Sequence, residues 1–199
     1  MKPDDIAQVI DEQRAALADL LATLEPAQWA TPSLCDGWTI REVAVHLTHA
    51  HAPRVDMMLA ALRAGFRFDA MMFQMALRDT AAPAQIVDRF HVMAGSRRRP
   101  PMTKPIDPLM DILIHTQDIG LPLGIDRPMP PQAAAAVANH LWRMRFPLNP
   151  QRRLPGVRFV ATDTELELGA GRTIEAPVRD IVLTLAGRPS SISADAAPA

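Results

Sequence analysis

Residues 108–119 read PLMDILIHTQDI, and this stretch decides how the rest of the chain is interpreted. Asp111, His115 and Asp118 follow one another at intervals of four and three residues, which places them within about 60° on one side of an α-helix. The other residues of the stretch are mostly apolar, so the pattern predicts a buried helix. Because burying an unpartnered carboxylate or imidazole is costly, something must compensate these side chains.

A divalent metal ion is one such partner, because residues at i and i+4 can reach the same ion, as in helical His-x-x-x-His sites. A hydrogen-bonded Asp–His pair is the alternative, and the spacing leaves both open. A further ligand would have to come from another helix, where His46, His49 and His51 lie. His49 projects away from the apolar stripe of that helix, and the helical angles do not decide between His46 and His51.

The overall charge of the 199 residues is balanced, with 21 Lys and Arg against 22 Asp and Glu. This balance argues against nucleic-acid binding driven by bulk charge. The Arg97–Arg99 run is interpreted as a solvated loop, with recognition of an acidic substrate as the alternative and nucleic-acid binding disfavoured. No apolar run reaches the roughly 18 residues that a membrane span needs, so no membrane partner is expected.

The first residues, MKPDDIAQ, carry acids where a secretory signal would be basic and then apolar. Cys35 is the only cysteine, which excludes an internal disulfide and a multi-cysteine zinc cluster. Both observations indicate a cytoplasmic protein. Cys35 itself is interpreted as a small packing residue, with a reactive thiol as the alternative.

Hydrophobic periodicity predicts a mainly α fold. The expected helices cover residues 4–24, about 39–53, 54–77 with a break near Gly65, 83–95, 108–119 and 131–146. Thr39 with Glu42 forms a capping-box pattern that begins the second helix. Strands at 157–161 and 166–168, a turn at 169–171 and a helix at 177–185 predict a small α+β appendage. The expected organisation is a helical metal-binding domain at 1–150, a strand-strand-helix subdomain at 155–189 and a flexible tail at 190–199.

Residues 32–47, PSLCDGWTIREVAVHL, resemble the loop and second helix of the mycothiol-dependent maleylpyruvate isomerase family, within the DinB-like superfamily. Residues 111–119 resemble the fourth-helix motif of that family, and the C-terminal strand, glycine turn and Ala186-Gly187-Arg188 resemble its small C-terminal part. The resemblance implies a DinB-like four-helix bundle that holds a divalent ion, usually zinc. The implied metal ligands are His46, Asp111 and His115.

One departure from the family concerns Asp111, which stands where the family's isomerases have Glu. Its side chain is one methylene shorter, so either the helices lie closer together or the metal is held more weakly. Asp118 matches an acidic position of the family, and we expect it to orient a ligand or the following loop. Nickel, iron or manganese would accept the same ligand set as zinc.

Three protein ligands leave a tetrahedral ion with one open position, which is the arrangement of catalytic zinc sites. A small thiol bound there would lose its proton, since metal coordination deprotonates thiols. We therefore predict a metal-dependent enzyme that activates a low-molecular-weight thiol, mycothiol by resemblance, for conjugation to or isomerisation of an electrophilic small molecule, as a transferase or isomerase. The alternative is a noncatalytic DinB-like bundle that binds a metal, ligand or partner. Neither a catalytic residue nor the electrophile is assigned, and Met and Phe side chains among residues 57–75 offer a homodimer face.

Overall fold

The structure is a computed structural model that describes residues 1–65, 67–99 and 103–192. It divides into two compact units, one formed by Ala7–Arg127 and the other by Met1–Ile6 together with Pro128–Ala199. Most of the predicted tail, residues 193–199, lies outside the described residues. The helix that follows Pro130 groups with the C-terminal unit, whereas the sequence analysis placed it in the N-terminal domain.

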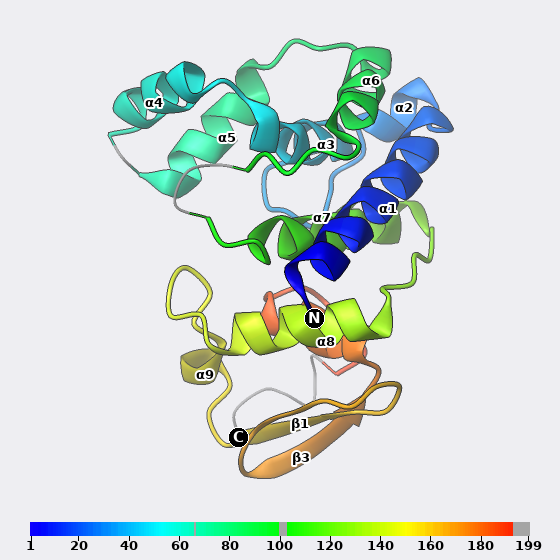
Figure 1. The fold of residues 1–199 in the computed structure, drawn as a ribbon, viewed down its shortest axis with the longest axis vertical. Helices are drawn as coiled ribbons and strands as arrows, with labels where there is room; N and C mark the ends of the chain where they lie inside the picture. Colours follow the sequence, from blue (N-terminus) through cyan, green and yellow to red (C-terminus); the bar gives the residue numbers. More distant parts are fainter. Residues whose placement is uncertain (66, 100–102, 193–199) are drawn as a thin grey trace. The chain divides into compact units, whose positions relative to one another are not determined.

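The helical unit takes up most of the chain and holds the candidate ligands (Figure 1). Its α-helices are α1 (Pro3–Ala22, whose first residues belong to the other unit), α2 (Pro26–Trp29), α3 (Ile40–Thr48), α4 (Arg54–Arg63), α5 (Phe68–Arg78), α6 (Pro83–Met93) and α7 (Asp107–Gly120). Short 3-10 helices follow α3 and α7, namely η1 (His49–His51) and η2 (Leu121–Leu123). The periodicity thus located the long helices correctly, while α2 and η2 were not predicted. The last residues of the helix predicted at 39–53 form the separate 3-10 helix η1.

Helix α3 is the central element of this unit, because it contacts α2, α5, α6 and α7 (Figure 1). It begins at the predicted capping box, where the Thr39 amide donates to Glu42 Oε2 at 2.9 Å and the Thr39 side chain also pairs with Glu42. Its predicted apolar stripe is buried: Ile40, Val43, Ala44 and Leu47. A buried stripe on a short helix fixes the rotation of α3 and therefore the directions of its histidines.

The predicted helical stretch 54–77 is interrupted near Gly65, as expected, and forms α4 and α5. Gly65 has a φ of +60°, a conformation that costs glycine little, and no atom lies within 4 Å of the position its Cβ would take. The chain can therefore change direction there. Helices α4 and α5 contact each other, and α5 also contacts α3.

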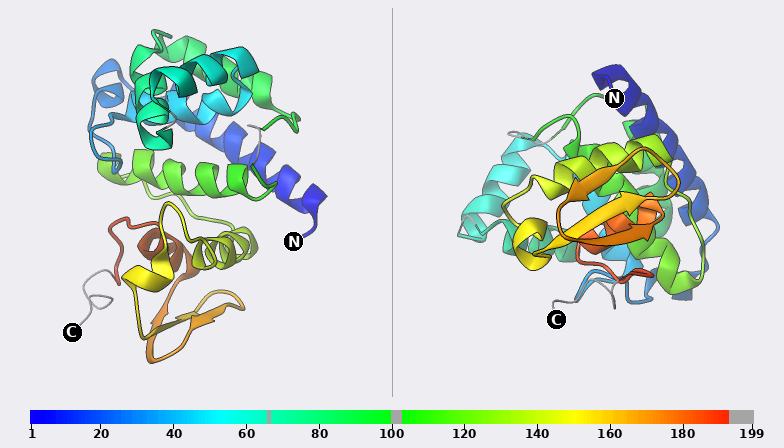
Figure 2. Two further views of the ribbon diagram at one scale, coloured as in Figure 1. Left: turned by 90° about the vertical axis from the view of Figure 1, so that its left-hand side faces the viewer. Right: turned by 90° about the horizontal axis from the view of Figure 1, so that it is seen from below.

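The C-terminal unit combines helices and one small sheet (Figure 2). Its elements are α8 (Pro131–Trp142), α9 (Pro150–Arg153), β1 (Val157–Ala161), β2 (Glu167–Gly169), β3 (Arg172–Ala176) and α10 (Val178–Leu185). The strand order is β2-β1-β3, with β1 antiparallel to β2 and parallel to β3. Helix α10 packs against both α8 and β1.

Strand β3 corrects the sequence analysis, which predicted only two strands. Its alternating burial depends on one large apolar side chain, Ile174, which gives a weak pattern. Gly169 and Gly171 join β2 to β3 across the start of β1, and a Cβ on either would lie 2.3 or 2.2 Å from the carbonyl oxygen of Val157 or Gly156. Both have positive φ, so the crossing requires glycine at these positions.

Among the described residues, no helix combines the length and the apolar character needed to cross a membrane.

Candidate functional site

The candidate site lies where α3 meets α7. His46 on α3 and His115 on α7 have ring centroids 5.0 Å apart, with the ring planes at 83°. Trp38, just before α3, places its ring 5.2 Å from that of His46, also edge to face. Of the two histidines that the helical angles left open, His46 is therefore the one whose ring lies against His115 of α7.

His46 is held in the neutral form that binds metal ions. Burial lowers its pKa well below the usual value, and the positive charge of His115 acts in the same direction. Its Nδ1 atom is buried and forms no hydrogen bond with any residue of the described ranges. Buried nitrogen atoms in native folds almost always have a hydrogen-bond partner or a bound ion. A cation bound to the neutral imidazole would supply such a partner.

On α7, His115 and Asp118 form a close pair, with Nδ1 of His115 2.8 Å from Oδ2 of Asp118. Asp118 has no solvent exposure. The same Oδ2 accepts a hydrogen bond from the thiol of Cys35 at 3.1 Å, and the Cys35 sulfur lies 3.7 Å from His115 Nδ1. Burial opposes protonation of His115, but its contacts with Asp118 and Cys35 outweigh burial and raise its pKa to about 10.

Cys35 reaches α7 because its loop is tied there by the backbone. The Leu34 amide donates to the carbonyl of Asp118 at 3.2 Å, and the Cys35 amide donates to the Ser33 hydroxyl at 3.1 Å. Gly37 turns the chain with a φ of +76° beside the ring of Phe73. Cys35 was interpreted from sequence as a packing residue, with a reactive thiol as the alternative. Its contact with Asp118 was not predicted, since nothing local indicates that a residue 83 positions earlier lies against that carboxylate.

Among the described residues, Cys35, His115 and Asp118 offer potential ligand atoms that all lie within 4.8 Å of one another. Ligands of a tetrahedral zinc ion would lie roughly 3.3–3.6 Å apart, given bond lengths of about 2.0–2.3 Å. The observed separations of 2.8 and 3.1 Å to Asp118 are shorter and match hydrogen bonds. Cys35 and Asp118 therefore orient His115, and its Nε2 atom remains the nitrogen suited to bind a ligand.

Asp111 lies one helical turn before His115 and is partly buried. Burial raises the pKa of its carboxyl to about 6, an increase that the charge of His115 opposes. It is not part of the close group formed by Cys35, His115 and Asp118. The structure thus brings His46 and His115 together, and Asp111 lies one turn before His115 on α7. Among the described residues, the one group of three close potential ligands includes neither His46 nor Asp111.

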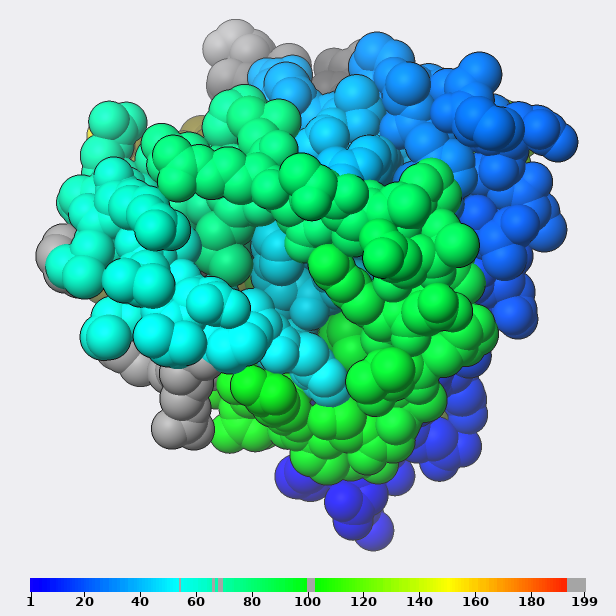
Figure 3. All heavy atoms as spheres, turned by 90° about the horizontal axis from the view of Figure 1, so that it is seen from above, coloured from blue at the N-terminus to red at the C-terminus, as the bar shows by residue number. Residues whose placement is uncertain are grey.

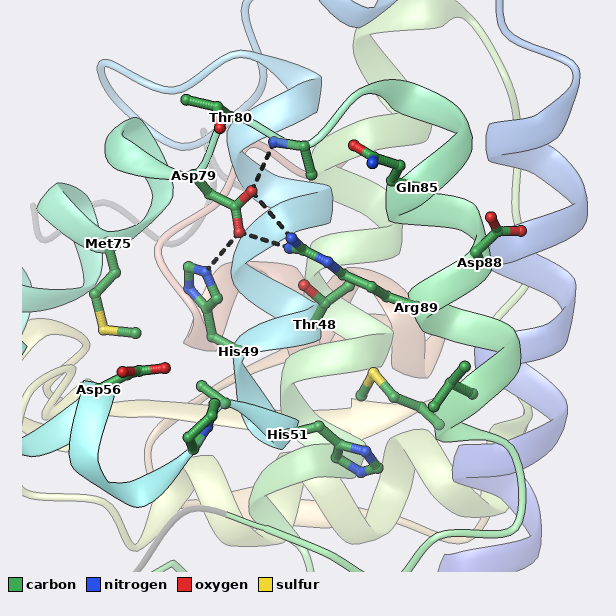
Figure 4. A pocket seen from close by; sticks show the side chains of 15 residues that line it. Thr48, His49, His51, Asp56, Met75, Asp79, Thr80, Gln85, Asp88 and Arg89 are labelled. Carbon is green, nitrogen blue, oxygen red and sulfur yellow. Dashed lines mark hydrogen bonds and ion pairs between the residues drawn. The ribbon is translucent and has the colours of Figure 1, made fainter.

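His49 and His51 line a different cavity of about 820 Å³, bounded by η1, the start of α4, the end of α5 and α6 (Figure 4). In this cavity Nε2 of His49 lies 3.5 Å from Oδ2 of Asp79, and Arg89 binds both oxygens of Asp79 at 2.5 and 3.3 Å. In Figure 3 the hollow opens between the cyan of α4 and the green of α6. The candidate metal ligands do not line this cavity, so His49 and His51 are separate from them.

The Arg97–Arg99 run is engaged with its own chain. Arg97 pairs with Asp11 at 2.8 Å, Arg98 donates to the carbonyl of Ala52 at 3.3 Å, and Arg99 donates to that of Thr103 at 3.0 Å. These contacts favour the interpretation as a structural loop over recognition of an acidic substrate.

Comparison with known proteins identifies related sequences and structures. Residues 10–108 match the family model described as the Mycothiol maleylpyruvate isomerase N-terminal domain. The match includes Cys35 and His46 and ends before Asp111. No curated protein sequence matches the chain significantly.

Two solved structures share the fold. The crystal structure of the mycothiol-dependent maleylpyruvate isomerase superposes with a TM-score of 0.64 at 13% identity, covering 96% of this chain and 91% of that chain. A histidine-to-alanine variant of that enzyme gives a TM-score of 0.63 at the same identity and coverage. The likeness confirms the predicted fold, a mainly α, DinB-like helical bundle with a small C-terminal α+β part.

Proposed function

Because the chain belongs to the mycothiol maleylpyruvate isomerase family, we propose that it is a metal-dependent enzyme that activates mycothiol for the isomerisation of, or conjugation to, an electrophilic small molecule. The observation that carries the proposal is the facing pair His46 and His115, one neutral and unpartnered at Nδ1 and the other oriented through its own Nδ1.

The donor atoms of the predicted ligands are of the types that bind a divalent cation. His46, His115 and Asp111 would hold it, with two imidazoles and one carboxylate as zinc prefers. Asp118 accepts from His115 Nδ1, so it selects the tautomer that leaves Nε2 free for a metal ion. When bound, the cation lowers the pKa of a coordinated thiol from about 8.5, so that the thiolate forms at neutral pH.

The protein's own residues contribute orientation and exclusion of water. The ring of Trp38 lies 5.2 Å from that of His46 and 6.3 Å from that of Phe73, so an aromatic wall of Trp38 and Phe73 begins at the α3 histidine. Such a wall shields a reactive thiolate from competing protons and restricts where an electrophile can approach. A cytoplasmic location, where low-molecular-weight thiols stay reduced, belongs to the same proposal.

The first test is the metal content of the purified protein. We expect about one divalent ion per chain, and loss of that ion in His46→Ala and His115→Ala. His91→Ala is the matched control, because His91 is an exposed histidine of α6 and should leave the metal content unchanged. Equal and negligible metal in the wild type and in His115→Ala would remove the basis of the proposal.

The second test is thiol-dependent turnover with mycothiol and maleylpyruvate, followed by a panel of other electrophiles. Isomerisation without net thiol consumption indicates an isomerase, and stoichiometric thiol loss indicates a transferase.

The alternative, a noncatalytic bundle, draws support from Asp111, whose shorter carboxylate lies outside the close ligand group. A protein that retains its metal but turns over no electrophile with thiol would establish that alternative.

A further inference from the structure

Helix α4 carries an apolar stripe that faces solvent. Four side chains repeat at helical spacing with high exposed fractions: Val55 at 55%, Met58 at 59%, Leu59 at 40% and Leu62 at 56%. Residues at i, i+3, i+4 and i+7 form one face of a helix, and in a globular protein that face is normally the buried one. We call these four residues the α4 stripe.

The helix beside α4 also exposes apolar side chains. Helix α5 packs beside α4 and exposes Phe73 at 37% and Leu77 at 50%. Single exposed apolar residues are ordinary, but four of them on one face of a helix are typical of an interaction surface. In Figure 3, α4 forms an outer edge of the molecule in cyan.

Two charged residues accompany the α4 stripe and indicate its partner. Asp56 and Arg63 lie seven residues apart, and neither forms an ion pair or side-chain hydrogen bond within the described parts of the chain. At 100° per residue they lie roughly 110° and 90° from the middle of the stripe, on the same side of the helix. The helix therefore has an acidic group near its start and a basic group near its end along one flank.

We propose that α4 pairs antiparallel with α4 of a second copy of this chain. In an isologous pair related by a two-fold axis, the same flank of each helix meets its counterpart, and every contact occurs twice. The midpoint between Asp56 and Arg63 lies within about one residue of the middle of the α4 stripe. Centring the stripes on each other therefore places Asp56 of each copy opposite Arg63 of the other, while the four apolar side chains are covered.

The arrangement accounts for two separate features of α4, its exposed apolar face and its unpaired flanking charges. A lipid surface would cover the face but would not select an acid and a base at complementary positions. The pairing uses residues of the helical unit alone and includes none of the candidate metal ligands, so it stands apart from the proposed catalytic function.

The test is the mass of the full-length protein in solution as a function of concentration, measured by sedimentation and by light scattering after gel filtration. We expect a dimer of twice 21.8 kDa at micromolar concentrations. Leu62→Glu should give a monomer with an unchanged circular dichroism spectrum, since the side chain is exposed in the monomer. Val92→Glu is the matched control, because Val92 is an exposed apolar residue of α6, 79% accessible and outside the stripe, and it should remain dimeric.

Charge reversal tests the register. Asp56→Arg and Arg63→Asp each place like charges opposite one another, and we expect the dimer to dissociate on the order of tenfold more readily. The double variant, Asp56→Arg with Arg63→Asp, restores opposite charges and should regain the wild-type dissociation constant. Single and double variants that weaken the dimer equally would overturn the antiparallel register.

A wild-type protein that stays monomeric at all accessible concentrations would refute the proposal. In that case, binding to phosphatidylcholine vesicles would show that the α4 stripe contacts a lipid surface. Thermal destabilisation of monomeric Leu62→Glu would show instead that the chain itself covers the stripe.

Discussion

Asp118 is the residue on which the proposed site depends most, and its replacement by Asn gives the sharpest test. Asp118→Asn keeps the shape of the side chain but removes the charge that both His115 and Cys35 contact. Because Asp118 is fully buried, water cannot replace that charge. We therefore expect a large loss of stability in the metal-free protein together with a changed pH dependence.

The magnitude follows from the pKa of His115, which is about 10 in the folded protein and about 6.5 in an unfolded chain. A difference of roughly 3.5 pH units corresponds to about 5 kcal/mol as an upper bound, and removing one partner of a buried ion pair costs about 3–5 kcal/mol. Because the folded-state pKa is raised, this stabilisation is fully present below about pH 6.5 and is lost as the pH rises toward 10.

The assay is urea-induced unfolding of chelator-treated protein at pH 6, 8 and 9.5, followed by circular dichroism. Between about pH 6.5 and 9.5 the wild type should lose about 1.4 kcal/mol of unfolding free energy per pH unit from His115 alone. Asp118→Asn should be about 3 kcal/mol less stable at pH 6 and should lack that decline. Asp88→Asn, at an exposed carboxylate of α6, is the control and should behave as the wild type.

An Asp118→Asn protein within about 0.5 kcal/mol of the wild type at pH 6, with the same slope against pH, would refute the reasoning. It would mean that His115 is neutral in the metal-free protein and that Asp118 does not hold its proton. Asp118 would then lose its assigned role in orienting the histidine.

Two further outcomes are expected. Burial would raise the pKa of Asp79, but hydrogen bonds from Arg89 and the Ala81 amide lower it on balance. Asp79→Asn should therefore lower the free energy of unfolding by about 1–3 kcal/mol at pH 7. This difference should vanish as the pH falls below the folded pKa of Asp79. An acid-unfolding curve unchanged from wild type would contradict this. Gly171→Ala should destabilise the C-terminal unit by at least about 2 kcal/mol, because its Cβ would lie 2.2 Å from a backbone oxygen. Gly95→Ala is the control, because Gly95 has a similar φ of +70° but no atom within 4 Å of its Cβ position. In thermal unfolding it should lose less stability than Gly171→Ala, and equal losses would exclude the clash as the cause.

The sequence by itself determined the features that arise within a few residues. Helix α7 occupies Asp107–Gly120 much as the pattern of 108–119 predicted, because a helix that is apolar on most sides is buried as a consequence of its own sequence. The start of α3 at Thr39 and Glu42 is equally local, since both hydrogen-bonding partners lie within one turn. The motif at 32–47 pointed to the family whose N-terminal domain model matches residues 10–108, whereas the motif at 111–119 lies beyond that match.

Only the tertiary structure decided which groups from distant segments meet. Helical angles left His46 and His51 equivalent, and the packing of α3 against α7 brought His46 to His115 while His51 lines another cavity. The contact between Cys35 and Asp118 and the placement of β1 between β2 and β3 likewise join residues whose separation in sequence carries no local signal. The physical reason is that spacing and hydrophobicity fix the rotation of one helix about its axis, whereas the choice of neighbour depends on the packing of all elements at once.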